Sequence, residues 1–221
     1  MNEKIRVAIL DDHQSIIDGY LFRLKNAPDI EVTNTFTYGE EVEPALEIQP
    51  VDVLLMDVEV PTSSTNPNTF PILYLIPRLH EKYPDLAILV ISMHNQRAMV
   101  RAIIDAGASG YILKDDRTAI IQLPAIIHLI QGGGIYLSQR LSGLIKASGG
   151  EAENPLTDRQ TEILSYCAAY PEANTAQIAQ HLNIAPSTVR NLLSGAYFKL
   201  DVPNKVSAIT KARQLGIIAR D

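Results

Sequence analysis

Three carboxylates directly follow two apolar segments of this 221-residue chain. Asp11 and Asp12 come after the segment 5–10, and Asp57 comes after the segment 51–56. Both segments are typical of strands buried in a parallel sheet. Because such strands present their carboxyl ends at one edge of the sheet, we expect the three carboxylates to lie close together. Carboxylates so placed repel one another unless a cation lies among them, and oxygen ligands favour a hard ion such as Mg²⁺.

Two further polar side chains end predicted strands of the same kind. Ser92 ends the apolar segment 86–92, and Lys114 ends the segment 110–114. A cation, a hydroxyl and an ammonium group are what a protein needs to hold a phosphoryl group on a carboxylate nucleophile. Taken singly, each residue has a simpler interpretation, such as a turn, a helix cap or a solvated strand end. Their shared position at strand ends favours a phosphoryl site.

The elements that must position these side chains alternate along the first 130 residues. This alternation predicts an α/β fold, a doubly wound, five-stranded parallel sheet of the flavodoxin-like kind. Pro77 and Pro124 lie inside helical patterns and predict kinks there. The predicted strands are 5–10, 30–36, 51–56, 86–92 and 110–114, and the predicted helices are 14–26, 40–48, 71–83, 95–106 and 117–131.

A glycine-bearing polar segment, 147–155, separates this pattern from a purely helical one. Thr157 with Gln160, and Asn174 with Gln177, have the spacing of capping boxes at two helix starts. A third helix begins near Pro186, and a last one covers about 204–215. We therefore expect an α/β domain over 1–132, a linker over 133–154 and a small all-α domain over 155–221.

The composition is that of an ordinary globular protein, with 46% hydrophobic and 20% charged residues. The single cysteine, Cys167, excludes an internal disulfide, and no apolar stretch has the length of a membrane span. We expect a cytoplasmic protein that has no membrane partner. The net charge of −6 comes wholly from residues 1–150, because residues 151–221 carry as many basic as acidic side chains. A neutral C-terminal part neither requires nor excludes a nucleic-acid partner.

Four motifs in the first domain carry a family resemblance. "ILDDH", "LLMD", "ILVIS" and "GYILK" resemble the receiver domain of bacterial two-component response regulators. The C-terminal segment "LTDRQTEIL…IAQHLNIAPSTVRNLLSGAYFKL" resembles the LuxR-type helix-turn-helix of the NarL/FixJ group. Together the two resemblances cover nearly the whole chain.

The resemblance implies a role for each residue of the first site. Asp57 would accept a phosphoryl group from a sensor histidine kinase, and Tyr111 would reorient on activation. The chain would then be a phosphoacceptor switch rather than an enzyme, with slow self-dephosphorylation at most, and a homodimer when phosphorylated. Asp11, Asp12, Asp57 and the main-chain carbonyl of Glu59 would hold Mg²⁺, and Ser92 and Lys114 would bond the phosphate.

In the second domain, a helix-turn-helix places its second helix in the major groove of double-stranded DNA. Arg190 can pair with guanine and Asn191 with adenine, whereas Lys199 and Lys205 would contact phosphates. The apolar stripe of the same helix lies on its opposite face. The residues predicted to contact DNA are Thr175, Ser187, Thr188, Arg190, Asn191, Ser194, Lys199 and Lys205.

Two other functions remain open. A Mg²⁺ phosphatase resembling haloacid dehalogenases would place an Asp two residues after its nucleophile, whereas this chain has Glu59. Alternatively, the helical domain docks a protein rather than DNA.

The segment 61–70 is also longer than the family pattern after Asp57. It is either a tolerated surface loop or a lid in which Phe70 folds over the phosphorylation site.

Overall fold

The computed structural model describes residues 4–141 and 155–219, in which a parallel sheet supports the first domain. The α/β class is confirmed, but the sheet has six strands rather than the predicted five, in the order β2-β1-β3-β6-β7-β8. The additional strand, β8, pairs only two residues with β7 and lies within the range predicted as linker. The strands are β1 (Ile5–Leu10), β2 (Ile30–Phe36), β3 (Val53–Met56), β6 (Ala87–Ser92), β7 (Gly110–Leu113) and β8 (Tyr136–Leu137).

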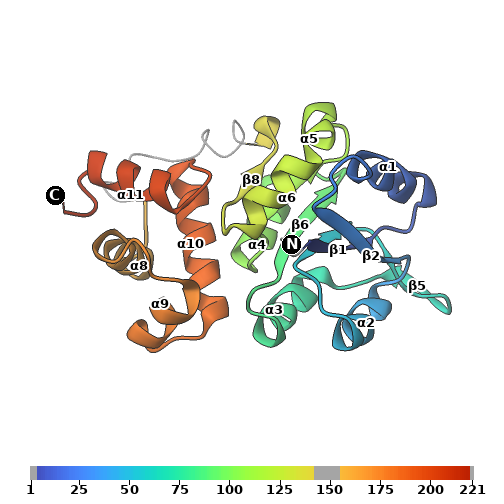
Figure 1. The fold of residues 1–221 in the computed structure, drawn as a ribbon, viewed down its shortest axis with the longest axis horizontal. Coiled ribbons are helices and arrows are strands. Elements are labelled where there is room, and N and C mark those ends of the chain that lie inside the picture. The colour runs from blue at the N-terminus through green and yellow to red at the C-terminus, as the bar shows by residue number, and fades with distance from the viewer. Residues whose placement is uncertain (1–3, 142–154, 220–221) are drawn as a thin grey trace.

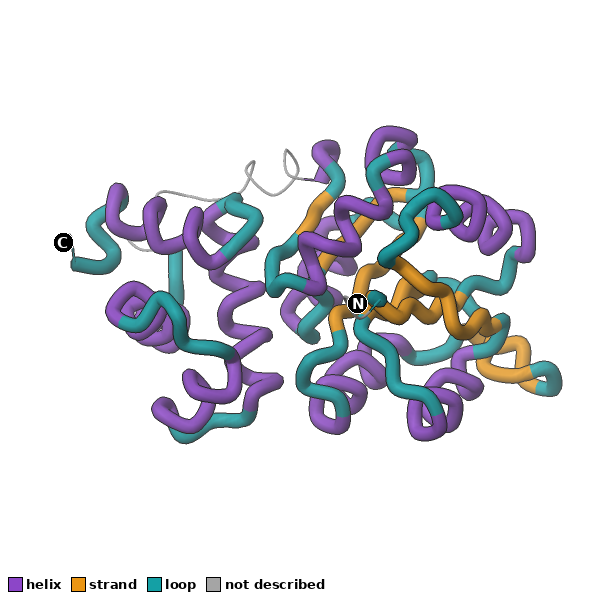
Figure 2. The backbone as a smooth tube through the Cα atoms, viewed as in Figure 1, coloured by secondary structure: helices purple, strands orange, loops and turns teal. Residues whose placement is uncertain are grey.

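Helices cover both faces of this sheet (Figures 1 and 2). Alternate strand residues point to opposite faces, so Leu54 and Leu55 enter different hydrophobic clusters. One cluster includes α2 (Val42–Ile48), α3 (Ile72–Lys82) and α4 (Arg97–Asp105). The other includes α1 (Gln14–Leu24), α5 (Arg117–Ile121) and α6 (Leu123–Gln131).

Two helices differ in detail from the sequence prediction. The helix predicted over 117–131 is divided into α5 and α6, and Pro124 stands in the first turn of α6, where its missing N–H costs no hydrogen bond. Pro77 instead lies inside α3, which continues through it.

The segment 61–70 is a hairpin rather than an irregular loop. β4 (Pro61–Ser63) and β5 (Asn66–Thr69) pair antiparallel in a separate two-stranded sheet. In Figure 1 the hairpin lies at the end of the molecule farthest from the helical domain. Phe70, just after β5, lies against Gly39 of the short 3-10 helix η1 (Gly39–Glu41). A Cβ atom added to Gly39 would lie 2.0 Å from Cγ of the Phe70 ring, so this contact needs glycine.

We expect Gly39→Ala to lower the free energy of unfolding by at least about 1 kcal/mol, because the ring at its Cγ cannot move aside without repacking. Urea denaturation of the full chain measures this change. Gly19→Ala is the matched control, because a Cβ there meets nothing within 4 Å and alanine favours the α1 helix by about 0.5–1 kcal/mol. If Gly39→Ala were as stable as the parent, this packing contact would not be a constraint.

The second domain consists of α8 (Asp158–Ala169), α9 (Thr175–Leu182), α10 (Pro186–Leu200) and α11 (Lys205–Gln214). Both predicted capping boxes are confirmed, at Thr157 and at Asn174. Asn183 and Asp201 end α9 and α10 in the left-handed conformation, with φ of 53° and 56°. Among the described residues, no helix combines the length and apolar character that crossing a bilayer requires.

α10 lies between the two domains and packs on both (Figure 1). It contacts α8, α9 and α11 of its own domain and α3 and α4 of the first domain. Tyr197 and Phe198 of α10 belong to the same hydrophobic cluster as Val100 and Ile103 of α4. A main-chain hydrogen bond of 2.8 Å, donated by Ile135 N to Pro203 O, also joins the domains. The helix predicted to read DNA is therefore part of an interdomain interface.

Candidate functional site

The predicted phosphoryl site is assembled at the carboxyl edge of the sheet, around Lys114. Its Nζ lies 2.7 Å from Asp11 Oδ2 and 2.8 Å from Asp57 Oδ2. Both carboxylates are almost fully buried, with Asp11 1% and Asp57 6% exposed. Burial alone would lower the pKa of Lys114, but its hydrogen bonds to the two carboxylates raise it above the ordinary value. The site therefore holds a positive charge beside a nearly buried carboxylate oxygen of Asp57.

Main-chain hydrogen bonds between neighbouring strand ends fix these positions. Asp57 N donates to Leu10 O at 2.9 Å, and Lys114 N donates to Ser92 O at 2.9 Å. The strand order therefore brings residues 46 and 57 positions apart to one edge, as the sequence predicted.

The remaining predicted ligands lie at the rim. Ligand atoms of Asp11, Asp12 and His13 lie within 4.8 Å of one another, and His13 Nδ1 is 2.7 Å from Asp12 Oδ1. Glu59 Oε1 lies 2.8 Å from His94 Nε2, and this contact links the segment after β3 to the segment after β6. The oxygen-rich part of this set suits a hard divalent cation.

Ser92 and Tyr111 are joined through the same segment. Ser92 Oγ accepts a hydrogen bond of 3.2 Å from His94 N, and the Tyr111 hydroxyl donates to His94 O at 2.8 Å. Tyr111 is fully buried, and burial raises the pKa of its phenol, with Asp57 adding to the shift and a bond to Ser92 opposing it. The aromatic ring is thus already inward, in contact with the segment that carries the hydroxyl.

Sequence reasoning missed Tyr20 of α1. Its side chain is 5% exposed, and its pKa is raised by burial and then by the charges of Asp11 and Asp57. The signal was present, because Tyr20 stands between Ile17 and Leu24 on the buried stripe of α1. Side chains of a helix point toward its N-terminus, which for α1 is the edge of the sheet that holds the site.

The residues predicted to contact DNA do not form a free surface in this structure. Arg190 hydrogen-bonds Leu86 O of the first domain and lies 3.6 Å from Asp85 Oδ1. Asn191 lies at Gly107, since a Cβ added there would be 2.3 Å from Asn191 Oδ1. Ser194 is only 4% exposed.

The other predicted contacts vary in their exposure. Thr188 is exposed, and the side chain of Ser187 lies outside the described residues. Lys199 donates to Gln160 Oε1 at 2.8 Å, and Lys205 donates to Pro171 O at 2.6 Å. Thr175, at the start of α9, faces an interdomain cavity of about 510 Å³. The structure thus brings the central residues of α10 onto the first domain, leaves Thr188 exposed, and leaves Thr175, Lys199 and Lys205 half-buried.

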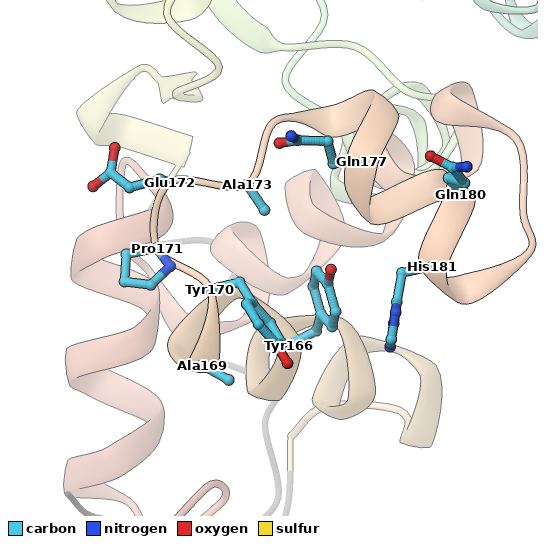
Figure 3. Close-up of a pocket in the computed structure, with 9 residues that line it drawn as sticks. All are labelled: Tyr166, Ala169, Tyr170, Pro171, Glu172, Ala173, Gln177, Gln180 and His181. Carbon is cyan, nitrogen blue, oxygen red and sulfur yellow. The ribbon is translucent and has the colours of Figure 1, made fainter.

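A separate hollow of about 730 Å³ lies between α8 and α9 (Figure 3). The ring of Tyr166 stacks on His181 at a centroid distance of 4.3 Å and lies 4.7 Å from Tyr170. These three rings connect α8 to α9 and so help to fix the angle of the helix pair.

The arrangement of sheet, acidic edge and helical domain defines a response regulator. Residues 7–124 match the response regulator receiver domain, and residues 154–212 match the family of bacterial regulatory proteins known as the luxR family. The chain belongs to the response regulators and carries a luxR-family domain at its C-terminal side.

Curated relatives match almost the full length of the chain. The transcriptional regulatory protein DesR of Bacillus subtilis is 29% identical over 96% of this chain and 98% of its own length. The transcriptional regulatory protein MctR of Rhizobium johnstonii is 30% identical over 98% of this chain and 97% of its own. A structure of the response regulator RcsB of Salmonella typhimurium aligns with a TM-score of 0.57 at 25% identity, over 95% of this chain and 98% of that one.

Proposed function

We propose that this response regulator is phosphorylated on Asp57 by a sensor histidine kinase and then regulates transcription by binding double-stranded DNA through α10. The observation that carries the proposal is the placement of Lys114 between the buried carboxylates of Asp11 and Asp57. A lysine there neutralises the incoming phosphoryl oxygens and leaves Asp57 as the nucleophile at the carboxyl edge of the sheet.

The roles of the other residues follow from their positions. Ser92 ends β6 and would bond the phosphoryl group, and Tyr111 holds the segment that follows β6 through His94 O. When Ser92 moves toward the phosphate, the main chain of His94 moves with it, and the Tyr111 bond changes. A chain with this arrangement acts as a phosphoacceptor switch, with slow self-dephosphorylation at most.

The donor set fits Mg²⁺ as the cation of this site. Asp11, Asp12, Asp57 and the main-chain carbonyl of Glu59 would hold it, all through oxygen, the element this ion prefers. When bound, Mg²⁺ supplies positive charge for the phosphoryl oxygens. Lys114 supplies the same kind of charge from the protein, so Asp11 and Asp57 are not left uncompensated in the structure described here.

The interface between α10 and the first domain is the part of the molecule that phosphorylation would change. In this structure α10 is docked on the first domain, an arrangement that we call closed. Arg190 and Asn191 contact the first domain, Ser194 is buried beside the interdomain cavity, and all three are withdrawn from DNA. α4, which packs on α10, begins five residues after Ser92. Phosphorylation would therefore shift the population from the closed arrangement to one with α10 free, and pairs of chains would bind as homodimers.

The relatives support DNA as the ligand of the helical domain. DesR and MctR are transcriptional regulatory proteins, and the RcsB structure at 25% identity concerns DNA interaction. Another RcsB structure at the same identity contains the receiver with the phosphomimetic BeF₃⁻.

The test is duplex capture with and without beryllofluoride, a mimic of the phosphoryl group. Genomic fragments enriched by the full chain provide a preferred duplex, and fluorescence anisotropy then gives its affinity. We expect beryllofluoride with Mg²⁺ to tighten binding at least about fivefold, the lower range of a typical coupling free energy. Asp57→Asn serves as the control that should not respond. Equal affinity with and without the analogue in the parent would separate phosphorylation from DNA binding and favour protein docking.

A further inference from the structure

His80 of α3 is fully buried at the interdomain interface. Its Nε2 lies 2.8 Å from Gly107 O, which makes Nε2 the protonated nitrogen of a neutral ring. Nδ1 is buried and has no hydrogen-bond partner anywhere in residues 4–141 and 155–219. A histidine with a buried, unpartnered nitrogen differs from a fully satisfied core histidine. If Nδ1 gained a proton, the new N–H group would have no acceptor for its hydrogen bond.

The groups around His80 come from both domains. A Cβ added to Gly107 would lie 2.7 Å from His80 Cδ2 and 2.3 Å from Asn191 Oδ1, so His80 and α10 meet at this glycine. Gly107 has a φ of +116°, which strongly favours glycine and lets the two side chains approach its backbone. Asn191 Oδ1 is also buried without a partner within the described part of the chain. The interface therefore contains two unsatisfied polar atoms, His80 Nδ1 and Asn191 Oδ1.

The charges that face this cluster are few. From α10 the guanidinium of Arg190 acts on His80, and it is held by Leu86 O and Asp85. α4 contributes the Arg101–Asp105 pair, whose charges act on Lys199 of α10. Tyr83, three residues after His80 at the end of α3, has a phenol oxygen that is buried without a partner among the described residues. The charge that acts on the His80 ring is thus positive and belongs to a residue predicted to read DNA.

We propose that His80 is a proton-sensitive latch between the domains: when its ring gains a proton, the closed arrangement opens and α10 becomes free without phosphorylation of Asp57. A protonated ring would place a second positive charge near Arg190, on a side chain that is fully buried. Departure of α10 removes Arg190 and exposes this side of the cluster to water. This inference goes beyond the proposed function and does not depend on it.

The direction of the effect follows from linkage. Burial, with Arg190 as the second cause, lowers the pKa of His80 from 6.5 to about 4, and the bond to Gly107 opposes this shift. The closed arrangement therefore binds fewer protons than the open one. The contribution of His80 to the stability of the closed arrangement is fully present above pH 6.5, and it is lost as the pH falls from 6.5 toward about 4. If opening restores the ordinary value, the open-to-closed ratio rises about tenfold between pH 7.5 and pH 5.5.

Thiol labelling measures this ratio even when the open form is rare. Ser194→Cys places a thiol at a buried position of α10, whereas Thr188→Cys places one at an exposed position of the same helix. The native Cys167 is fully buried in the helical domain. The labelling rate of the first thiol by an aromatic disulfide, divided by that of the second at the same pH, gives the open fraction of the unphosphorylated full chain.

We expect the open fraction to rise about tenfold from pH 7.5 to pH 5.5 in the parent. His80→Gln should abolish this rise, since its amide can still donate to Gly107 O but does not titrate. His128→Gln is the matched control and should keep it, because His128 pairs with Asp29 on a distant part of the first domain. An equal rise in His80→Gln, or no rise in the parent, would overturn the proposal.

A second measurement covers the case in which His80→Gln does not fold. Nuclear magnetic resonance titration of the five histidines in the parent gives the pKa of each ring. The latch requires His80 to titrate well below 6.5 in the closed protein. Titration of His80 near its ordinary value would exclude it.

Discussion

Asp57→Asn is expected to reduce labelling by a small phosphodonor, such as acetyl phosphate with Mg²⁺, to background. The amide keeps the shape of the carboxylate but removes the nucleophilic oxygen that lies 2.8 Å from Lys114 Nζ. Intact-protein mass spectrometry measures the added phosphoryl group. This is the largest effect we expect from a single substitution, because the variant lacks the reacting atom itself.

Asp52→Asn is the matched control for this experiment. Asp52 immediately precedes β3, and Asp57 immediately follows this strand. Asp52 pairs with Arg6 at the opposite edge of the sheet from the phosphoryl site. It should therefore keep full labelling although the chain has lost the same charge. Undiminished labelling of Asp57→Asn would place the acceptor elsewhere, and loss of labelling in both variants would indicate a damaged fold instead.

Arg190→Ala is expected to weaken binding to a preferred duplex by about 1–3 kcal/mol, if the guanidinium pairs with a guanine. The measurement should use the beryllofluoride form, because Arg190 also holds the closed arrangement through Leu86 O. In the unactivated protein, loss of that contact would partly offset loss of the base contact. Anisotropy titrations against preferred and scrambled duplexes separate specific from general binding.

Two other variants serve as comparisons for the duplex affinity of Arg190→Ala. Lys199→Ala should weaken all duplexes alike and lower the salt slope by about one unit, as expected for a phosphate contact. Asp85→Ala removes the partner of Arg190 on the first domain and leaves α10 unchanged, so it should not weaken binding. If neither Arg190→Ala nor Lys199→Ala altered duplex affinity, α10 would not enter the groove and a protein-docking role would gain support.

The sequence predicted those parts of the fold that long, regular patterns encode. The apolar strands that end at Met56 and Ser92 were found because short apolar runs that alternate with helical patterns favour buried strands. β8 was missed because it has only two residues, and its pairing depends on the exposed edge of β7 rather than on its own sequence. The hairpin at 61–69 was missed because its residues favour turns and are mostly exposed.

The meeting of Asp57 and Lys114 at the carboxyl edge of the sheet was also predictable from regular patterns. Parallel strands fix where Asp57 and Lys114 must meet, whichever helices surround them. The position of Arg190 was not predictable, because a polar helix face has the same sequence whether it meets DNA or another domain. Its contact with Leu86 joins residues 104 positions apart and depends on how two separately patterned domains dock.

In the hydrophobic cluster that runs from α4 into α10, each domain covers apolar surface of the other. Tyr197 and Phe198 are 2% and 8% exposed in the closed arrangement, and opening uncovers part of that apolar surface. The open chain should therefore be the more fragile one, and the more easily cleaved by proteases. Binding DNA would restore part of the lost protection. A signal that frees α10 would then also shorten the lifetime of any copy that finds no duplex, so the size of the response is limited by the number of available binding sites.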